Sequence, residues 1–257
     1  MRRVAVPVAA AVAVALMVLP LAGLLQRAPW STIGTELATP EAREALGLSL
    51  ATSLGALAVS MVLGLPLAWV LARVAFRGRT VVRALVTLPM VLPPVVGGVG
   101  LLSVFGRRGL VGAHVGSLPA FPLPFTVQAV VLAQAFVAMP FLVIAAEAGL
   151  RQLDGRYEEA ASTLGARPWH RFRTVTVPLV APSLVAGAAL CWARALGEFG
   201  ATVTFAGSLP GRTRTLPTAI YAGLQSRPES AIALSVVLLA VSLTVLVALR
   251  GNWLGHR

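Results

Sequence analysis

The sequence contains no lysine, and all 21 of its basic residues are arginines. A P-loop that binds the phosphates of ATP needs the pattern Gly-x-x-x-x-Gly-Lys-Ser/Thr, which a chain without lysine cannot provide. Cysteine is almost absent as well. The single one, Cys191, has no partner for an internal disulfide and stands in an apolar run, so we expect a small buried residue there.

Histidine and charged residues are also scarce. The three histidines, His114, His170 and His256, stand far apart without a second ligand at metal-binding spacing, so we expect no metal site. Only 12% of the residues are charged, against about 25% in a typical soluble domain. This composition, with 57% hydrophobic residues, excludes a soluble fold and predicts an integral membrane protein.

Six apolar segments are long enough to cross about 30 Å of hydrocarbon, which takes about 20 helical residues. They cover residues 4–25, 48–72, 84–105, 124–150, 179–206 and 231–249. The first segment is longer than the apolar core of a signal peptide, about 7–15 residues, and no clear cleavage site follows it, so we expect a retained span. The sequence therefore predicts one all-α membrane domain over residues 1–257, with six transmembrane helices.

The arginines predict the orientation of these spans, because cytoplasmic loops of membrane proteins are enriched in basic residues. With a cytoplasmic N-terminus, thirteen arginines fall inside and seven outside, and an even number of spans returns the C-terminus to the cytoplasm. The inner set is Arg2, Arg3, Arg73, Arg77, Arg79, Arg83, Arg151, Arg156, Arg167, Arg171, Arg173, Arg250 and Arg257. Topology and contact with anionic lipids thus account for the net charge of +12, and we expect no nucleic-acid partner.

The third apolar segment is interrupted by three prolines. Pro89, Pro93 and Pro94 each lack an amide donor and disrupt the preceding helical turn. Irregular backbone at membrane depth persists only where it packs in protein or lines a wet cavity. The residues leave two interpretations open, a kinked packing helix or a helix that lines a translocation path.

The fifth apolar segment contains two charges, Arg194 and Glu198, four residues apart and therefore on one helical face. Charges within a membrane tend to pair and to face protein or a cavity. Either they form a structural ion pair or they stand beside a transport path. The hydroxyls of Thr202 and Thr204 could contact a passing oxyanion or bond within their own helix.

The longest predicted cytoplasmic segment, residues 151–178, has the features of two short helices joined by an elbow. Asp154 is a suitable N-cap, Gly165 can end the first helix, and Pro168 can begin the second. Trp169, Phe172 and Val175 then follow at spacings of three, and Pro178 closes the unit. Such a segment either rests on lipid heads or docks on a soluble partner.

This segment resembles the signature loop of ABC-type import permeases, which reads Glu-Ala-Ala, three residues, Gly, nine residues, Ile-x-Leu-Pro. Here the corresponding residues are Glu159, Ala160, Ala161 and Gly165, followed by Val175-Thr176-Val177-Pro178, with Val in place of both Ile and Leu. The resemblance implies a type I importer permease with a MetI-like fold in the inner membrane of a prokaryote. It assigns ATPase coupling to Glu159, Ala160, Ala161, Gly165, Trp169, Val175 and Pro178.

The same resemblance implies the partners. A second copy of the chain would complete the pore, two separate ATPase subunits would bind ATP and Mg²⁺, and an extracytoplasmic binding protein would deliver the substrate. The chain itself would hold no cofactor and would not be an enzyme. It is not expected to hydrolyse ATP, in keeping with the missing lysine.

The stretch Arg194–Tyr221, RALGEFGATVTFAGSLPGRTRTLPTAIY, together with LPPVV at 92–96, resembles the molybdate branch of that family. This implies transport of molybdate and tungstate. The sulfate and thiosulfate permeases share the Arg-Ala-x-Gly-Glu-Phe/Tyr-Gly element and remain the alternative. The candidates for the path, or for an intramembrane ion pair, are Pro93, Pro94, Arg194, Glu198, Thr202 and Thr204.

Two other classes compete with an importer. An ion-coupled secondary transporter would work alone and usually shows internal repeats, and no convincing repeat relates the two halves of this sequence. A membrane enzyme would need a catalytic motif, and neither Gly-x-Ser-x-Gly nor His-Glu-x-x-His occurs. We interpret Glu147, a carboxylate near the end of a span, as an interfacial or packing residue.

Overall fold

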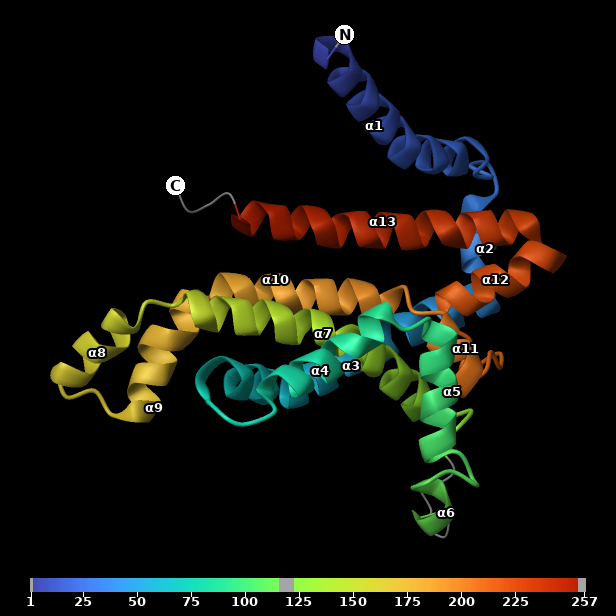
Figure 1. Cartoon of the computed structure of the whole chain (residues 1–257). Coiled ribbons are helices and arrows are strands. Elements are labelled where there is room, and N and C mark those ends of the chain that lie inside the picture. The colour runs from blue at the N-terminus through green and yellow to red at the C-terminus, as the bar shows by residue number, and fades with distance from the viewer. Residues whose placement is uncertain (1, 116–122, 254–257) are drawn as a thin grey trace.

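The computed structural model describes residues 2–115 and 123–253, and every regular element in this part of the chain is helical (Figure 1). The first seven are α1 (Arg2–Gln26), α2 (Ile33–Ala38), α3 (Pro40–Arg73), α4 (Arg79–Val91), α5 (Pro94–Phe105), α6 (Gly112–Val115) and α7 (Val127–Gln152). The others are α8 (Gly155–Thr163), α9 (Pro168–Arg171), η1 (Phe172–Thr176), α10 (Val177–Leu196), α11 (Gly200–Phe205), α12 (Leu216–Ser226) and α13 (Pro228–Trp253). The all-α prediction is confirmed.

Three helices, α3, α7 and α10, pack side by side at the centre of the molecule (Figure 1). Small residues bring them close together. A Cβ on Gly187 of α10 would lie 2.7 Å from the Cβ of Ala145 on α7, and one on Gly149 would lie 2.6 Å from the Cβ of Ser183. Membrane helices associate through such close packing, because lipid tails provide no hydrophobic driving force between them.

Hydroxyl groups on the buried face of α3 bind two other parts of the chain. Ser53 Oγ accepts a hydrogen bond of 2.9 Å from Trp192 Nε1 of α10. Ser49 Oγ accepts one of 2.6 Å from the amide of Leu216, the first residue of α12. Since a membrane interior offers no water to these groups, the two bonds help to set where α10 and α12 lie against α3.

The segment expected to form one span at 84–105 consists of two helices, α4 and α5, bent by 117° at the break between them. The prolines explain the bend. A residue that precedes proline is driven out of the helical region, and both Leu92 (ψ 136°) and Pro93 (ψ 129°) are extended. Two extended residues in sequence turn α5 away from the bundle axis, so that α5 and α6 project from one end (Figure 1).

The segment expected at 179–206 is also interrupted. α10 ends at Leu196, Gly197 to Phe199 leave the helix, and α11 begins at Gly200. The short α11 packs against α5, where a Cβ on Gly98 would lie 2.7 Å from the Cβ of Thr204. A Cβ on Gly200 would also lie 2.9 Å from the Cβ of Pro94. The two breaks, at Pro93 and at Glu198, are therefore close together, where α5 packs against α11.

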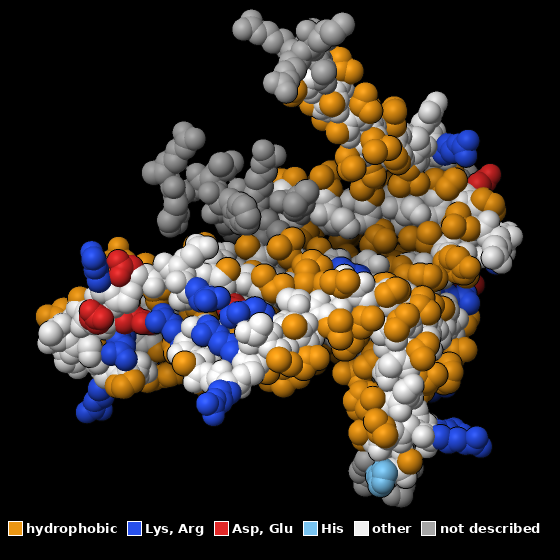
Figure 2. All heavy atoms as spheres, viewed as in Figure 1, with side chains coloured by type: hydrophobic (Ala, Val, Ile, Leu, Met, Phe, Trp, Pro, Cys, Tyr) orange, Lys and Arg blue, Asp and Glu red, His pale blue; other side chains and the backbone are white. Residues whose placement is uncertain are grey.

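Five helical stretches are long and apolar enough to cross a membrane, and the bent pair of α4 and α5 is a sixth if it is counted as one span. The five are Val6–Gln26, Pro40–Arg73, Val127–Gln152, Pro168–Leu196 and Pro228–Val245. At 1.5 Å per residue, α3 is about 51 Å long and extends beyond the hydrocarbon layer. Figure 2 shows hydrophobic side chains over most of the visible surface and charged ones gathered at the end formed by α8 and α9.

Some residues of the orientation argument are not placed by the structure. Arg257 lies outside the described residues, and the side chains of Arg2, Arg3 and Arg250 are not described.

Candidate functional site

The 151–178 segment forms an elbow beyond the end of the central bundle (Figure 1). Its first helix, α8, begins where Asp154 Oδ1 accepts a hydrogen bond of 3.0 Å from the amide of Arg156. It ends at Thr163, with Leu164 as its C-cap, and Gly165 follows with a φ of +80°, a conformation that favours glycine. The second helix, α9, begins at Pro168, as its fixed φ favours. These three local predictions from the sequence are confirmed.

The second arm of the elbow differs from the expectation, because Pro178 does not close it. Residues 168–196 form one continuous helical stretch through α9, η1 and α10. In η1 the backbone is π-helical, with the amide of Val177 bonded to the carbonyl of Phe172. Pro178 has no amide and its ring disfavours an ordinary turn before it, which explains the wider π turn at this place. The second arm of the elbow is therefore an extension of a helix that is long and apolar enough to span a membrane.

Part of the aromatic face of this extension packs against α3 of the same chain. Phe172 packs edge-on against Trp69 of α3, with ring centroids 5.3 Å apart, and stacks on Trp169 at 5.5 Å. The guanidinium of Arg73 lies 5.6 Å from the centre of the Trp69 ring. Three large side chains of the segment remain mostly exposed at its outer end, namely Tyr157, Leu164 and Trp169.

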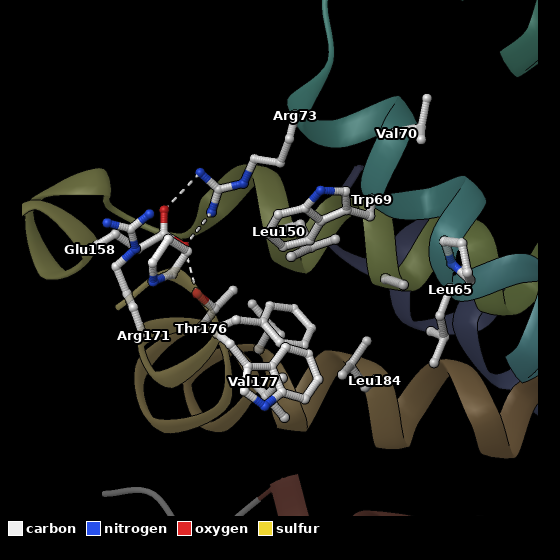
Figure 3. Close-up of a pocket in the computed structure, with 16 residues that line it drawn as sticks. Leu65, Trp69, Val70, Arg73, Leu150, Glu158, Arg171, Thr176, Val177 and Leu184 are labelled. Atoms are coloured by element: carbon white, nitrogen blue, oxygen red, sulfur yellow. Dashed lines mark hydrogen bonds and ion pairs between the residues drawn. The ribbon is translucent and has the colours of Figure 1, made fainter. Parts of the chain in front are cut away.

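Among the residues to which the resemblance assigns ATPase coupling, Glu159, Ala160, Gly165, Trp169 and Pro178 are exposed, whereas Ala161 and Val175 are half-buried. The neighbouring Glu158, which sequence analysis did not select, turns inward. Its carboxylate pairs with Arg73 at 3.1 Å and accepts a hydrogen bond of 2.6 Å from the hydroxyl of Thr176 (Figure 3). The only feature of the sequence that could have pointed to Glu158 is the pair of adjacent carboxylates at 158 and 159.

A cavity of about 830 Å³ lies beside this contact (Figure 3). Its lining is mainly apolar and comes from the ends of α3 and α7, from the start of α10 and from the elbow. Leu65, Trp69, Leu150, Phe172 and Leu184 are among the residues that face it. Packing between the elbow and the bundle is therefore incomplete on this side.

A second carboxylate stabilises the same end of the bundle. Glu147 of α7 is buried and pairs with Arg83 of α4, with Arg83 Nε at 3.1 Å from Oε1 and 3.3 Å from Oε2. It also pairs with Arg151 at 3.5 Å, one turn further along α7. This confirms the interpretation of Glu147 as a packing residue.

At the break between α10 and α11, the predicted pair is formed. Arg194 Nη1 lies 2.6 Å from Glu198 Oε2, and Glu198 Oε1 accepts a hydrogen bond of 2.8 Å from the amide of Ala201. Glu198 is past the end of α10, not within one helix with Arg194 as expected, and its second bond caps the start of α11. Thr204 bonds the carbonyl of Gly200 inside α11, as the second interpretation of this hydroxyl allowed.

Three side chains that are 0% exposed have no hydrogen-bond partner among the described residues. They are Ser60 of α3, Gln134 of α7 and Thr202 of α11. Pro93 and Pro94 lie at the other break, against α11. The structure thus brings the candidate path residues of α5 and α11 together, at some distance along the fold from the elbow (Figure 1).

Comparison with known proteins identifies the family. Residues 60–256 match the family described as binding-protein-dependent transport system inner membrane component. The chain belongs to this family. The permease is accordingly a multi-pass inner-membrane subunit of an ABC transporter, which also includes a binding protein and an ATPase that binds the ATP.

Three relatives illustrate its place in the family. The molybdenum transport system permease protein ModB of Mycobacterium bovis is 46% identical over 231 residues, covering 89% of this permease and 86% of the relative. ModB of Escherichia coli K12 is 38% identical over 213 residues, covering 83% of this permease and 93% of the relative. The sulfate transport system permease protein CysT of the same strain is 35% identical over 238 residues, covering 91% and 86%.

Solved structures confirm the fold. A bacterial alginate ABC transporter in complex with its pentasaccharide-bound periplasmic protein has a TM-score of 0.76 at 18% identity, covering 96% of this permease and 93% of that chain. The inward-facing MetNI methionine ABC transporter has a TM-score of 0.59 at 19% identity, covering 81% and 94%. The prediction of a MetI-like permease fold is thereby confirmed.

Proposed function

We propose that this permease forms the membrane pathway of an ATP-driven importer for molybdate, and for the similar oxyanion tungstate. The observation that carries the proposal is the 46% identity to ModB of Mycobacterium bovis over 89% of the chain. The identity to ModB of E. coli exceeds that to CysT by a small margin, 38% against 35%. Sulfate is therefore the competing substrate that a test must include.

The elbow at 151–178 is the surface on which the ATPase docks. Tyr157, Leu164 and Trp169 are exposed by 58%, 88% and 70% on a part of the chain that extends beyond the bundle. Apolar side chains that project from a polar end of a protein suit insertion into a groove of a partner. Glu159 and Gly165 of the signature motif lie on the same exposed elbow.

Two copies of the permease form the pore, and both termini of each are cytoplasmic. Val95, Val96 and Val99 of α5 are each about half exposed, so that one copy leaves an apolar face beside the bend at Pro93 and Pro94. A second copy would cover such a face, and a large exposed apolar surface of this kind indicates a lipid or protein contact. Figure 2 shows a group of arginine side chains at the end with the elbow, which supports its cytoplasmic location.

The substrate is tested with the complete transporter, purified with its ATPase and binding protein and reconstituted in liposomes. We expect molybdate-loaded binding protein to stimulate ATP hydrolysis and uptake, and sulfate-loaded protein to have little effect. Stimulation by the sulfate-loaded form alone would transfer the proposal to sulfate. Stimulation by neither anion would overturn it.

The orientation is tested by single cysteines in a Cys191→Ser background. We expect Arg167→Cys on the elbow to react with an impermeant maleimide only in inside-out vesicles. Arg212→Cys, at the opposite end of the molecule, should react only in right-side-out vesicles. The reverse pattern would contradict the proposed topology, and both exposed positions serve as matched controls for each other.

A further inference from the structure

Glu158 joins three elements that belong to different parts of the chain. It lies in the first turn of α8, where a carboxylate also suits the positive end of the helix. Its Oε2 pairs with Arg73, the last residue of α3, and its Oε1 accepts a hydrogen bond from Thr176 at the end of η1. We propose that Glu158 is a positioning residue that fastens α8 to the ends of α3 and α10, so that displacement of α8 by the ATPase moves both spans.

The contacts of Glu158 with Arg73 and Thr176 fix the position of its side chain relative to both partners. Arg73 approaches with both terminal nitrogens, Nη1 at 3.1 Å from Oε2 and Nη2 at 3.3 Å from Oε1. Thr176 is 1% exposed, so its bond to Glu158 is shielded from water. The side chains of Glu158 and Arg73 are 19% and 27% exposed, so the ion pair is partly hydrated. Hydrogen bonds to a charged group are stronger than neutral ones, and two-point contact with a guanidinium also fixes direction.

The surroundings give this contact its mechanical importance. α8 packs on α9 and η1, while Arg73, at the end of α3, lies 85 residues earlier in the chain than Glu158. The cavity of about 830 Å³ lies between the elbow, the ends of α3 and α7 and the start of α10 (Figure 3). Apolar packing between the elbow and α3 includes the contact of Phe172 with Trp69 but is incomplete beside it, so the bond from Glu158 to Arg73 is the direct link that carries a movement of α8 to α3.

The π turn explains why Thr176 can take part. η1 lies at the joint between α9 and α10, directly before Pro178. The amide of Val177 reaches back to Phe172, which widens the helix at the position where Thr176 is buried against Glu158. Single π turns often occur at functional positions, and this one lets the elbow and the span move as one helix.

Glu158 and Glu159 thereby have separate tasks. Glu159 belongs to the signature motif and is exposed on the outside of α8, where the ATPase docks in the proposed function. Glu158, about 100° further around the same helix, faces the bundle. The inference rests on that proposed function, because transmission through Glu158 requires a partner that moves α8.

The test compares transport per ATP hydrolysed in the reconstituted complex. We expect Glu158→Gln, which keeps an acceptor for Thr176 but loses the charge, to assemble and hydrolyse ATP while the ratio of imported anion to ATP falls about 10-fold. Couplings between sites typically correspond to about 5- to 150-fold. Glu41→Gln is the matched control, because it makes the same change at an exposed carboxylate at the other end of α3, outside the elbow, and we expect it to keep the wild-type ratio.

Thr176 offers a second, independent pair of variants. Thr176→Val keeps the shape and removes the hydroxyl, and we expect a reduced ratio of transport to hydrolysis. Thr176→Ser keeps the hydroxyl, and we expect it to restore the wild-type ratio. A role in stability alone would lower transport and hydrolysis in proportion, so the ratio would not change.

If Glu158→Gln prevents assembly, the inference is tested with the double variant Arg73→Glu with Glu158→Arg, in which the two charges are exchanged. Recovery of assembly and ratio above both single variants supports the inference, and no recovery overturns it. A wild-type ratio in assembled Glu158→Gln also overturns it while leaving the importer intact. Wild-type complex that imports neither molybdate nor sulfate would instead overturn the proposed function, and the inference with it.

Discussion

Glu158 and Glu198 each pair with an arginine and lie at opposite ends of the helical stretch 168–196, yet they connect different amounts of structure. Glu158 binds Arg73, 85 residues earlier, and so joins α8 to α3. Glu198 binds Arg194, four residues earlier, and also caps α11 through the amide of Ala201. The first pair connects separate elements, whereas the second fixes the shape of one segment.

Burial separates the two pairs further. The side chain of Glu198 is 1% exposed, and that of Glu158 is 19% exposed. An uncompensated charge in a buried site destabilises a fold strongly, while a partly exposed charge can be hydrated. We therefore expect that loss of the Arg194–Glu198 pair, the more conspicuous one in the sequence, mainly harms folding. Loss of the Arg73–Glu158 pair should leave the fold intact and change the coupling of transport to ATP hydrolysis.

The largest expected effect follows from breaking the local pair at one end. Arg194→Leu should leave Glu198 buried without its cation and lower stability by about 3–5 kcal/mol. The double variant Arg194→Leu with Glu198→Leu should recover much of this loss and retain a deficit of about 1 kcal/mol from the missing cap on α11. The measurement is thermal unfolding of the purified permease in detergent. Equal loss of stability in the single and double variants would contradict the view that the uncompensated charge of Glu198 is what destabilises the fold.

A smaller effect tests the close contact that holds the second break in place. Gly98→Ala should place a methyl group 2.7 Å from the Cβ of Thr204 and 2.9 Å from the carbonyl of Ala201, and overpacking of this kind costs about 1–3 kcal/mol. Gly100→Ala on the same helix is the control, because a Cβ there meets nothing within 4 Å. Unfolding temperatures of the two variants give the comparison. Equal temperatures would contradict the described packing of α5 on α11.

The smallest effect is expected at the elbow, where the backbone conformation of a glycine, and not the space around it, limits which residue can replace it. A Cβ meets nothing within 4 Å at either Gly165 or Gly155, but only Gly165 has a positive φ, of +80°. Gly165→Ala should cost about 1–2 kcal/mol in the elbow and weaken association with the ATPase about 5- to 30-fold. Gly155→Ala should leave association unchanged. Co-purification at increasing dilution measures the difference, and parallel curves would contradict a docking role of the elbow geometry.

Much of the elbow could be predicted from local residues, because caps and turns depend on a few neighbours. Asp154, Gly165 and Pro168 each act where the sequence places them. The continuity of α9 with α10 could not be predicted in this way. Proline usually ends a helix, and only the surrounding packing allows Pro178 to produce a π turn instead.

Contacts between distant segments were the other part that local patterns could not provide. Three prolines indicated a break in the third apolar segment but not its angle of 117°, which depends on the packing of α5 against α11. The pair of Arg73 and Glu158 requires the ends of two helices to meet, and no spacing in the sequence contains that information. The pair of Arg194 and Glu198 was predictable because its partners are four residues apart.

The most direct test of the difference between the two pairs is the number of anions imported per ATP hydrolysed, measured in one reconstituted system. For Glu158→Gln we predict a low ratio with hydrolysis close to that of the wild type. For the double variant of Arg194 and Glu198 we predict that fewer complexes assemble and that the assembled ones keep the wild-type ratio. A normal ratio in Glu158→Gln together with a low ratio in the double variant would contradict the account.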